Sequence, residues 1–267
     1  MTGETGQLRL RGGTMGSLDG KVAIVTGAGR GVGRGVAMAL AKAGADVAIA
    51  EIDAASGEST ASAARGLGRR AISIPCDVRT RQACEAAVAS AVDGLGGLHI
   101  LVNNAIQVRP GVSFMNHLDE DMVMTWESGV MATFWCMQAS QPHLVAAGGG
   151  SIINFGSGAG TEGLPGFAGY AAAKEGIRAL TRVAAREWGP AGIRVNAICP
   201  FANSEGMQGW SDFDPDGYRA AIDRVPLGRI GDCEADIGRV AVFLASDDSA
   251  YLTAHTFMVD GGSGAFR

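Results

Sequence analysis

The chain has 267 residues, with 22 basic and 27 acidic side chains, a net charge of −5 and 47% hydrophobic residues. It is long enough to bury the core of one large α/β domain and too apolar to be disordered. The acidic balance argues against nucleic acid or an anionic membrane as a partner. No apolar run reaches the roughly 18 residues of a membrane span.

The N-terminal residues 1–17 are polar and rich in glycine, and they lack the apolar stretch of a signal peptide. We therefore expect a disordered tail over 1–17, with Met15 as an alternative start, and one domain over 18–267. The same features lead us to expect a cytoplasmic protein.

Short β-branched runs alternate with alanine-rich amphipathic stretches along the chain. The runs that we expect to form strands are 21–27, 46–51, 71–77, 98–105, 151–157, 193–199 and 255–260. Most are almost continuously apolar, as in strands that are covered on both faces. Repeated strand–helix alternation predicts a single doubly wound α/β domain with about seven parallel strands and helices on both faces.

A glycine-rich loop, "TGAGRGVGRG" at 26–35, follows the first expected strand and precedes a helical pattern. Glycine permits the tight turn and lets a pyrophosphate approach the amides at the positive end of the helix. The strict G-x-G-x-x-G spacing is absent, so the prediction depends on the strand before the loop and the helix after it. The expected phosphate-binding residues are Gly27, Arg30, Gly31, Val32 and Gly33.

A carboxylate ends the second expected strand, in "AEID" at 50–53. A carboxylate at this place accepts hydrogen bonds from the adenosine ribose and repels a 2′-phosphate. Glu51 fits this role, with Asp53 as the second choice, which favours NAD over NADP. Two observations leave alternatives open: Arg30 could pair with a 2′-phosphate, and Glu51 could be a solvated charge at a strand end.

Tyr170 and Lys174 stand four residues apart in "GYAAAKEG" at 169–176, although the chain has only three tyrosines and three lysines. Residues i and i+4 share one helix face. An ammonium group near a phenol favours the phenolate and so lowers the phenol's pKa towards neutral pH. The pair therefore predicts a general acid/base, with an incidental helix pair as the alternative.

Several motifs together resemble the short-chain dehydrogenase/reductase family. They are "TGAGRGVG" (26–33), "NNA" (103–105), Ser157, "YAAAK" (170–174), "GIRVNAICP" (192–200) and "VDGG" (259–262). The resemblance implies a Rossmann-type sheet, a nicotinamide cofactor and a homo-oligomer, often a tetramer. It also implies that Ser157 hydrogen-bonds the substrate oxygen, with Tyr170 and Lys174 as its catalytic and cofactor-binding partners. Further cofactor contacts are implied at Asp77, Val78, Asn103, Ala105 and Pro200.

Four departures from the family pattern lie around the expected nicotinamide end of the site. Gly129 stands where the family usually has an asparagine that supports a water relay behind the lysine. Ile106 and Phe201 replace glycines, and Glu205 lies where a threonine is often found. The adenosine end has no such departures.

The segment 201–226 carries Trp210, Phe213 and Tyr218 but no strand pattern. It follows the sixth expected strand, so it is a candidate substrate lid, with a surface excursion that packs its own aromatic residues as the alternative. Ile106, Phe201 and Trp210 are the candidate substrate contacts, and their character suggests an apolar or cyclic secondary alcohol or ketone.

These features predict an NAD-dependent oxidoreductase that interconverts a small-molecule alcohol and its ketone by hydride transfer. The alternative is a catalytically degenerate NAD-binding protein that acts as a sensor or an assembly partner. The cysteines and histidines are dispersed and have no ligand spacing, so we expect reduced thiols and no metal site.

Overall fold

The computed structural model describes residues 17–264 and contains one sheet of seven parallel strands in the order β3-β2-β1-β4-β5-β6-β7. The strands are β1 (Val22–Thr26), β2 (Asp46–Glu51), β3 (Ala71–Pro75), β4 (Ile100–Asn103), β5 (Gly150–Phe155), β6 (Ile193–Pro200) and β7 (Thr256–Val259). The predicted doubly wound fold is confirmed. The expected tail lies outside the described residues, apart from Ser17.

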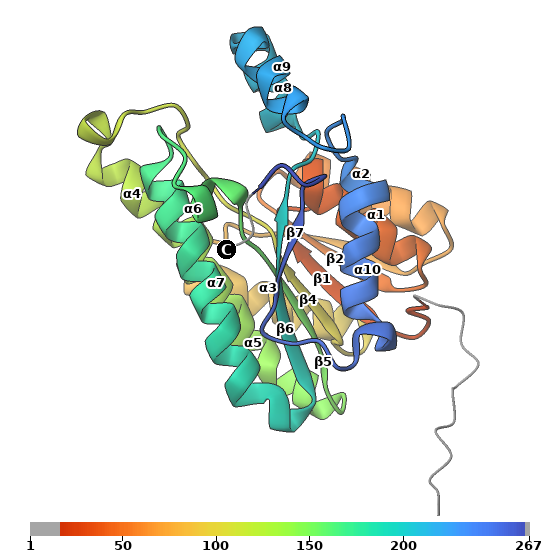
Figure 1. Cartoon of the computed structure of the whole chain (residues 1–267). Helices are drawn as coiled ribbons and strands as arrows, with labels where there is room; N and C mark the ends of the chain where they lie inside the picture. Colours follow the sequence, from red (N-terminus) through yellow and green to blue (C-terminus); the bar gives the residue numbers. More distant parts are fainter. Residues whose placement is uncertain (1–16, 265–267) are drawn as a thin grey trace, which may run out of the picture.

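Helices cover both faces of the sheet (Figure 1). One face carries α1 (Gly31–Lys42), α2 (Ala54–Gly66) and α10 (Arg239–Ala245), and the other carries α3 (Arg81–Leu95), α4 (Asp119–Trp126), α5 (Ala132–Ala146) and α7 (Ala168–Trp188). The short helices are α6 (Gly158–Glu162), α8 (Glu205–Phe213), α9 (Pro215–Asp223), η1 (Phe114–Asn116), η2 (Glu127–Met131), η3 (Gly189–Ala191), η4 (Cys233–Gly238) and η5 (Asp247–Ser249). No helix of residues 17–264 combines the length and apolarity needed to cross a membrane.

The two helix layers give the domain two hydrophobic cores. Val36 and Leu40 of α1 pack with β1 and α10 on one face, whereas Val88 of α3 and Leu144 of α5 pack on the other. Strands β1 and β4 are completely buried, because helices cover both of their faces. This explains their continuous apolar sequence.

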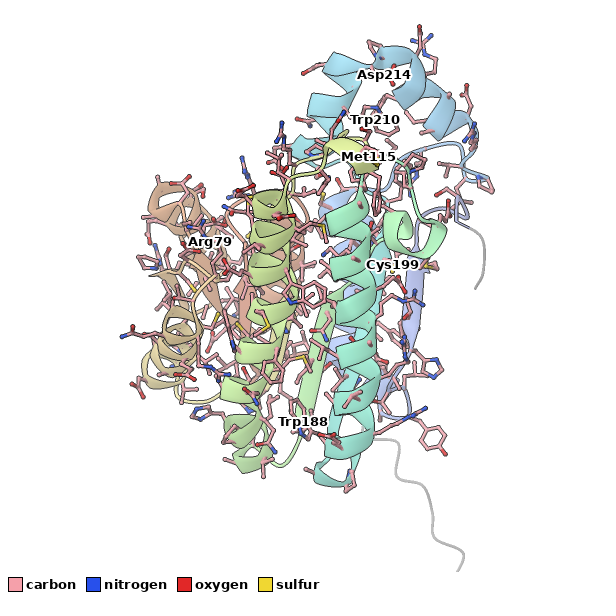
Figure 2. The ribbon with its side chains drawn as sticks, turned by 90° about the vertical axis from the view of Figure 1, so that its left-hand side faces the viewer. Arg79, Met115, Trp188, Cys199, Trp210 and Asp214 are labelled. Atoms are coloured by element: carbon pink, nitrogen blue, oxygen red, sulfur yellow. The ribbon has the colours of Figure 1, made fainter. Side chains whose placement is uncertain are left out.

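The sheet order reverses between β1 and β4, and the loops after these strands diverge to opposite faces. A crevice therefore opens at their carboxyl ends, which is where open α/β sheets bind ligands. The segment after β6 forms α8 and α9, which rise above this edge (Figure 1). Trp210 of α8 and Trp188 at the end of α7 mark opposite ends of the molecule (Figure 2).

Candidate active site

A cavity of about 550 Å³ lies at the carboxyl ends of β1, β2, β3 and β4. Eight of the expected cofactor residues border it: Gly27, Arg30, Val32, Gly33, Glu51, Asp77, Val78 and Ala105. The candidate substrate residue Ile106 borders it as well. Five other expected cofactor residues do not border this cavity: Gly31, Asn103, Tyr170, Lys174 and Pro200.

The glycine loop approaches its neighbours too closely for larger residues. A Cβ atom on Gly33 would lie 2.2 Å from the Gly27 carbonyl oxygen and 2.5 Å from Asn104 Nδ2. Gly27 and Gly31 have φ angles of 61° and 53°, which side chains disfavour. Helix α1 begins at Gly31, so the open amides of its first turn and the positive end of its dipole face the cavity. These features fit a pyrophosphate.

The Glu51 carboxylate is fixed at the cavity wall by backbone amides. Its Oε2 accepts from Gly29 N at 2.8 Å, and its Oε1 accepts from Ile52 N at 2.9 Å and Asp53 N at 3.3 Å. Asp53, the second choice, instead caps α2 by accepting from Ala55 N and does not border the cavity. The structure therefore favours Glu51 over Asp53 as the acidic group that faces an adenosine ribose.

Two further polar groups were expected to contact the cofactor: Asp77 at its adenine end, and Asn103 beside it. Asp77 accepts from the Arg79 guanidinium, which lowers the pKa of the Asp77 carboxyl, and both residues border the cavity. Asn103 donates from Nδ2 to Asn154 Oδ1 at 2.8 Å, while its own buried Oδ1 has no partner among the described residues. An unpartnered buried acceptor is costly, but Asn103 does not border the cavity. Of the two groups, only Asp77 faces the space expected for a nucleotide.

Ser157, Tyr170 and Lys174 meet at the ends of β5 and α7. Ser157 caps α6, where its Oγ accepts from Ala159 N at 3.2 Å, and its hydroxyl is hydrogen-bonded to Tyr170. Lys174 Nζ lies 5.5 Å from the centroid of the Tyr170 ring and donates to the Phe155 carbonyl oxygen at 2.8 Å. The predicted shared helix face of Tyr170 and Lys174 is confirmed.

The electrostatics of this trio differ from the sequence-based expectation. Burial lowers the pKa of Lys174 to about 8, because its side chain is only 3% exposed. Burial also raises the pKa of Tyr170 above its ordinary value, and the neighbouring Ser157 hydroxyl opposes this rise. The expected lowering of the Tyr170 pKa is therefore wrong for the protein without ligand. Lys174 bonds to a carbonyl and not to the phenol, and burial is the largest cause of the raised pKa of Tyr170.

Gly129 and Ile106, two of the departures from the family pattern, lie against each other. Gly129 is buried in the π-helical turn η2, and a Cβ atom there would lie 2.8 Å from Ile106 Cδ1 and 3.6 Å from Ala173 Cβ. Ile106 also packs with Val130, Ala173 and Ile177 in a small apolar cluster. A larger residue at 106 is thus matched by a smaller one at 129, and the region behind Lys174 is apolar.

This pairing predicts non-additive effects of substitution. Gly129→Asn alone pushes against Ile106, and Ile106→Ala alone leaves a cavity, so each is expected to lower the free energy of unfolding. The double variant should be more stable than the sum of the two effects by about 1 kcal/mol, measured by urea denaturation of all four proteins. Additive effects would show that the two positions do not share this space.

The candidate lid is helical, and its aromatic residues contact each other. Trp210 of α8 and Tyr218 of α9 pack edge to face, with ring centroids 5.7 Å apart. Neither Trp210 nor Phe201 borders the 550 Å³ cavity. The side chain of Phe213 lies outside the described structure. Helices α8 and α9 rise above the site, with Trp210 and Asp214 at the same end as Met115 (Figure 2).

The structure adds residues that the sequence motifs did not indicate. Asn104, Gln107, Ser128 and Ser204 border the cavity. Asn104 Nδ2 donates to the carbonyl oxygens of Thr26 and Gly27, so it connects the end of β4 to the glycine loop. In the sequence, only the place of Asn104 within the "NNA" motif indicated that it belongs to the site.

The cysteines are reduced, as expected, but they are not all scattered in space. Cys84 of α3 donates to the Val78 carbonyl oxygen at 3.3 Å and lies beside Cys76 and Cys136. Hydrogen bonding between these thiols, together with burial, raises the pKa of Cys76 and of Cys84 well above its usual range. Among residues 17–264, no group of cysteine, histidine and carboxylate side chains has an arrangement that could hold a metal ion.

Comparisons with known proteins identify the family of this chain. A family model described as enoyl-(acyl carrier protein) reductase matches residues 27–264. The chain belongs to the short-chain dehydrogenase/reductase family. It is therefore an oxidoreductase of the alcohol/ketone type that uses a nicotinamide cofactor and a small-molecule substrate.

Three relatives illustrate the range of this family. The chain is 38% identical to the 12α-hydroxysteroid dehydrogenase of Clostridium sp., over 94% of this chain and 99% of the relative. It is 37% identical to the inactive 2-(S)-hydroxypropyl-CoM dehydrogenase 2 of Xanthobacter autotrophicus, over 83% and 96%. A 7α-hydroxysteroid dehydrogenase solved with NADH and 7-oxo glycochenodeoxycholic acid superposes with a TM-score of 0.89, at 30% identity over 94% and 96%.

Proposed function

We propose that this protein is an NAD-dependent dehydrogenase that interconverts an apolar, cyclic secondary alcohol and its ketone, with Tyr170 as the general acid/base. The observation that carries the proposal is the position of Lys174. Its amine is buried 5.5 Å from the centroid of the Tyr170 ring and donates to the carbonyl oxygen of Phe155, two residues before Ser157.

The cofactor supplies the chemistry of hydride transfer at its nicotinamide ring when it is bound. The protein's own side chains transfer the proton. During oxidation, the Tyr170 phenolate oxygen takes the proton from the alcohol oxygen, and during reduction the Tyr170 hydroxyl gives its proton to the carbonyl oxygen. Ser157, whose hydroxyl is hydrogen-bonded to Tyr170 in the protein without ligand, donates its proton to the same substrate oxygen and stabilises the charge that develops there.

Lys174 controls the proton on Tyr170. With a pKa of about 8, its amine is largely protonated at neutral pH and holds a positive charge below the ring. This charge favours the phenolate when the site is excluded from water, because charges interact more strongly at low dielectric. Ile106, Val130 and Ala173 surround the adjacent space with apolar atoms, which supports this exclusion.

The preference for NAD over NADP follows from Glu51. Three backbone amides fix its carboxylate at the cavity wall, where it can accept hydrogen bonds from a ribose and repel a 2′-phosphate. Arg79, a basic group at this end, is paired with Asp77. Arg30 borders the cavity, and it is the group that would favour NADP.

The proposed substrate class rests on the apolar surface beside the site. Phe114, Met115, Leu118 and Leu164 are exposed hydrophobic residues from η1, the start of α4 and the end of α6, with Phe114 81% and Met115 90% exposed. Three of these residues lie within 114–118, and a group of exposed apolar side chains is typical of a binding surface. The similarity to two hydroxysteroid dehydrogenases supports a rigid, polycyclic substrate.

The test is reduction of NAD and of NADP, followed by absorbance, across hydroxysteroids, cyclohexanols and linear secondary alcohols. We expect turnover of cyclic alcohols with NAD. Glu51→Gln should lower the NAD-to-NADP ratio of kcat/KM about tenfold, because removing the carboxylate charge removes its repulsion of a 2′-phosphate. Asp53→Asn is the matched control, since it removes a neighbouring charge and keeps a side chain that caps α2. A wild-type preference for NADP, or an equal change with Asp53→Asn, would refute the cofactor assignment.

A second candidate function is binding of NAD without redox turnover. Gly129 removes the side chain that usually supports the water relay, Ile106 fills the space, and one relative at 37% identity is named as inactive. Calorimetry that detects NAD binding, together with no turnover across the whole alcohol panel and with the corresponding ketones, would favour this function. The retained Ser157, Tyr170 and Lys174 favour the enzyme.

A further inference from the structure

The start of helix α8 lies against the glycine loop. A Cβ atom on Gly31 would be 2.9 Å from Glu205 Oε2 and 3.5 Å from Ser204 Cβ. Ser204 and Glu205 also border the 550 Å³ cavity, which they share with Gly27, Arg30 and Gly33. A carboxylate from the candidate lid therefore stands at the N-terminus of α1, where the loop geometry fits a pyrophosphate.

Helix α1 does not cap its own N-terminus, and the carboxylate of Glu51 accepts from Gly29 N in the loop just before the helix. Its N-cap residue Arg30 forms no side-chain cap, and the first turn of α1 has no acidic residue. Glu205 in turn has no ion pair among residues 17–264. A negative charge near open helix amides is stabilised by the dipole, so Glu205 takes the electrostatic place of a phosphate.

We propose that Glu205 is an internal competitor of the cofactor's pyrophosphate. This inference rests on the proposed function, because it assumes that a dinucleotide binds at the glycine loop. Two phosphate charges and the Glu205 carboxylate repel each other strongly at such short range. The cofactor can bind only after Glu205 leaves the N-terminus of α1, and this displacement lowers the affinity for the cofactor.

The competition also connects cofactor binding to the lid. Glu205 is the first residue of α8, and α8 contacts α9 through Trp210 and Tyr218. Displacing Glu205 therefore moves the start of the helix pair that lies above the substrate side of the site (Figure 1). In the protein without cofactor, Glu205 holds the start of α8 against the glycine loop. Binding of the cofactor releases α8 from this loop.

The test is the dissociation constant of NAD, ADP-ribose and adenosine, measured by calorimetry with the full chain and with Glu205→Gln. The substitution keeps the size of the side chain and removes its charge. We expect NAD and ADP-ribose to bind about three- to tenfold more tightly to Glu205→Gln, and adenosine, which has no phosphate, to bind equally. The matched control is Asp212→Asn, because Asp212 is an exposed carboxylate on the same helix that does not border the cavity.

The outcomes separate this inference from the proposed function. If the wild type binds NAD and Glu205→Gln binds it no more tightly, the competition is refuted while the cofactor assignment stands. An equal gain with Asp212→Asn, or a gain for adenosine, would also refute the competition. Binding that is detected only for Glu205→Gln would support it. If no variant binds NAD or NADP, both proposals fail. Melting temperatures without ligand confirm that each variant is folded.

Discussion

Tyr170→Phe is expected to lower kcat by about 10²- to 10⁴-fold, because general acid/base catalysis contributes a factor of this size. The substitution removes the hydroxyl and keeps the ring, whose edge-to-face contact with Phe167 has a centroid distance of 6.0 Å. Binding of NAD and the melting temperature should change little. The measurement is kcat with the best substrate of the panel, combined with calorimetry of NAD binding.

The matched control for this variant is Tyr251→Phe. Tyr251 is completely exposed and borders a second cavity together with His99 and Gly150, at the amino ends of the strands. It is far from the carboxyl ends where Tyr170 lies. Unchanged turnover in Tyr170→Phe would exclude this residue as the acid/base, and an equal loss in Tyr251→Phe would show that the loss is not specific.

Lys174→Met is expected to lower kcat by about 100-fold or more, and to change how stability depends on pH. The methionine fills similar volume but has neither the charge that favours the phenolate nor the donor to the Phe155 carbonyl oxygen. The activity loss should persist at every pH, because no titration of the variant can replace the ammonium group.

The effect on stability follows from the lowered pKa. The amine has a pKa of about 8 in the folded protein and an ordinary value of 10.5, so below pH 8 folding must bury a charge. Between pH 8 and 10.5 the unfolded chain holds a proton that the folded protein has released, so stability rises with pH. The lowering corresponds to about 3 kcal/mol. The free energy of unfolding of the wild type, relative to Lys174→Met, should increase by about this amount across the interval.

The measurement is denaturant unfolding of both proteins at several pH values from 7 to 10.5, with Lys42→Met as the control. Lys42 lies on the surface, with its side chain 53% exposed and paired with Glu234. Its removal should not produce a comparable slope. A difference between wild type and Lys174→Met that stays constant with pH would show that the amine is not desolvated, and would remove the electrostatic basis of the proposed mechanism.

Much of the fold was predictable because strands and helices repeat at short range. The seven apolar runs coincide with the seven strands, although the run at 98–105 shortens to Ile100–Asn103. The residues that follow, Asn104 and Ala105, leave the sheet and donate from their backbone amides to Thr26 Oγ1. A hydrophobic run indicates burial, and it does not indicate where the sheet pairing ends.

The adenosine end of the candidate site was also predictable, because its parts are close in sequence or stand at strand ends. The glycine loop and Glu51 both border the cavity, as expected. The lid residues were harder to place. Trp210 packs on Tyr218, and whether aromatic side chains face a substrate or each other depends on how two helices cross, which no local pattern encodes.

The amino-acid sequence by itself determined the parallel α/β architecture, the glycine loop and the shared face of Tyr170 and Lys174, since these follow from backbone geometry over a few residues. Only the tertiary structure decided which distant atoms meet: Ile106 against Gly129, and Glu205 against Gly31. It also decided the pKa of Lys174, because desolvation depends on every segment that packs around the amine and not on its neighbours along the chain.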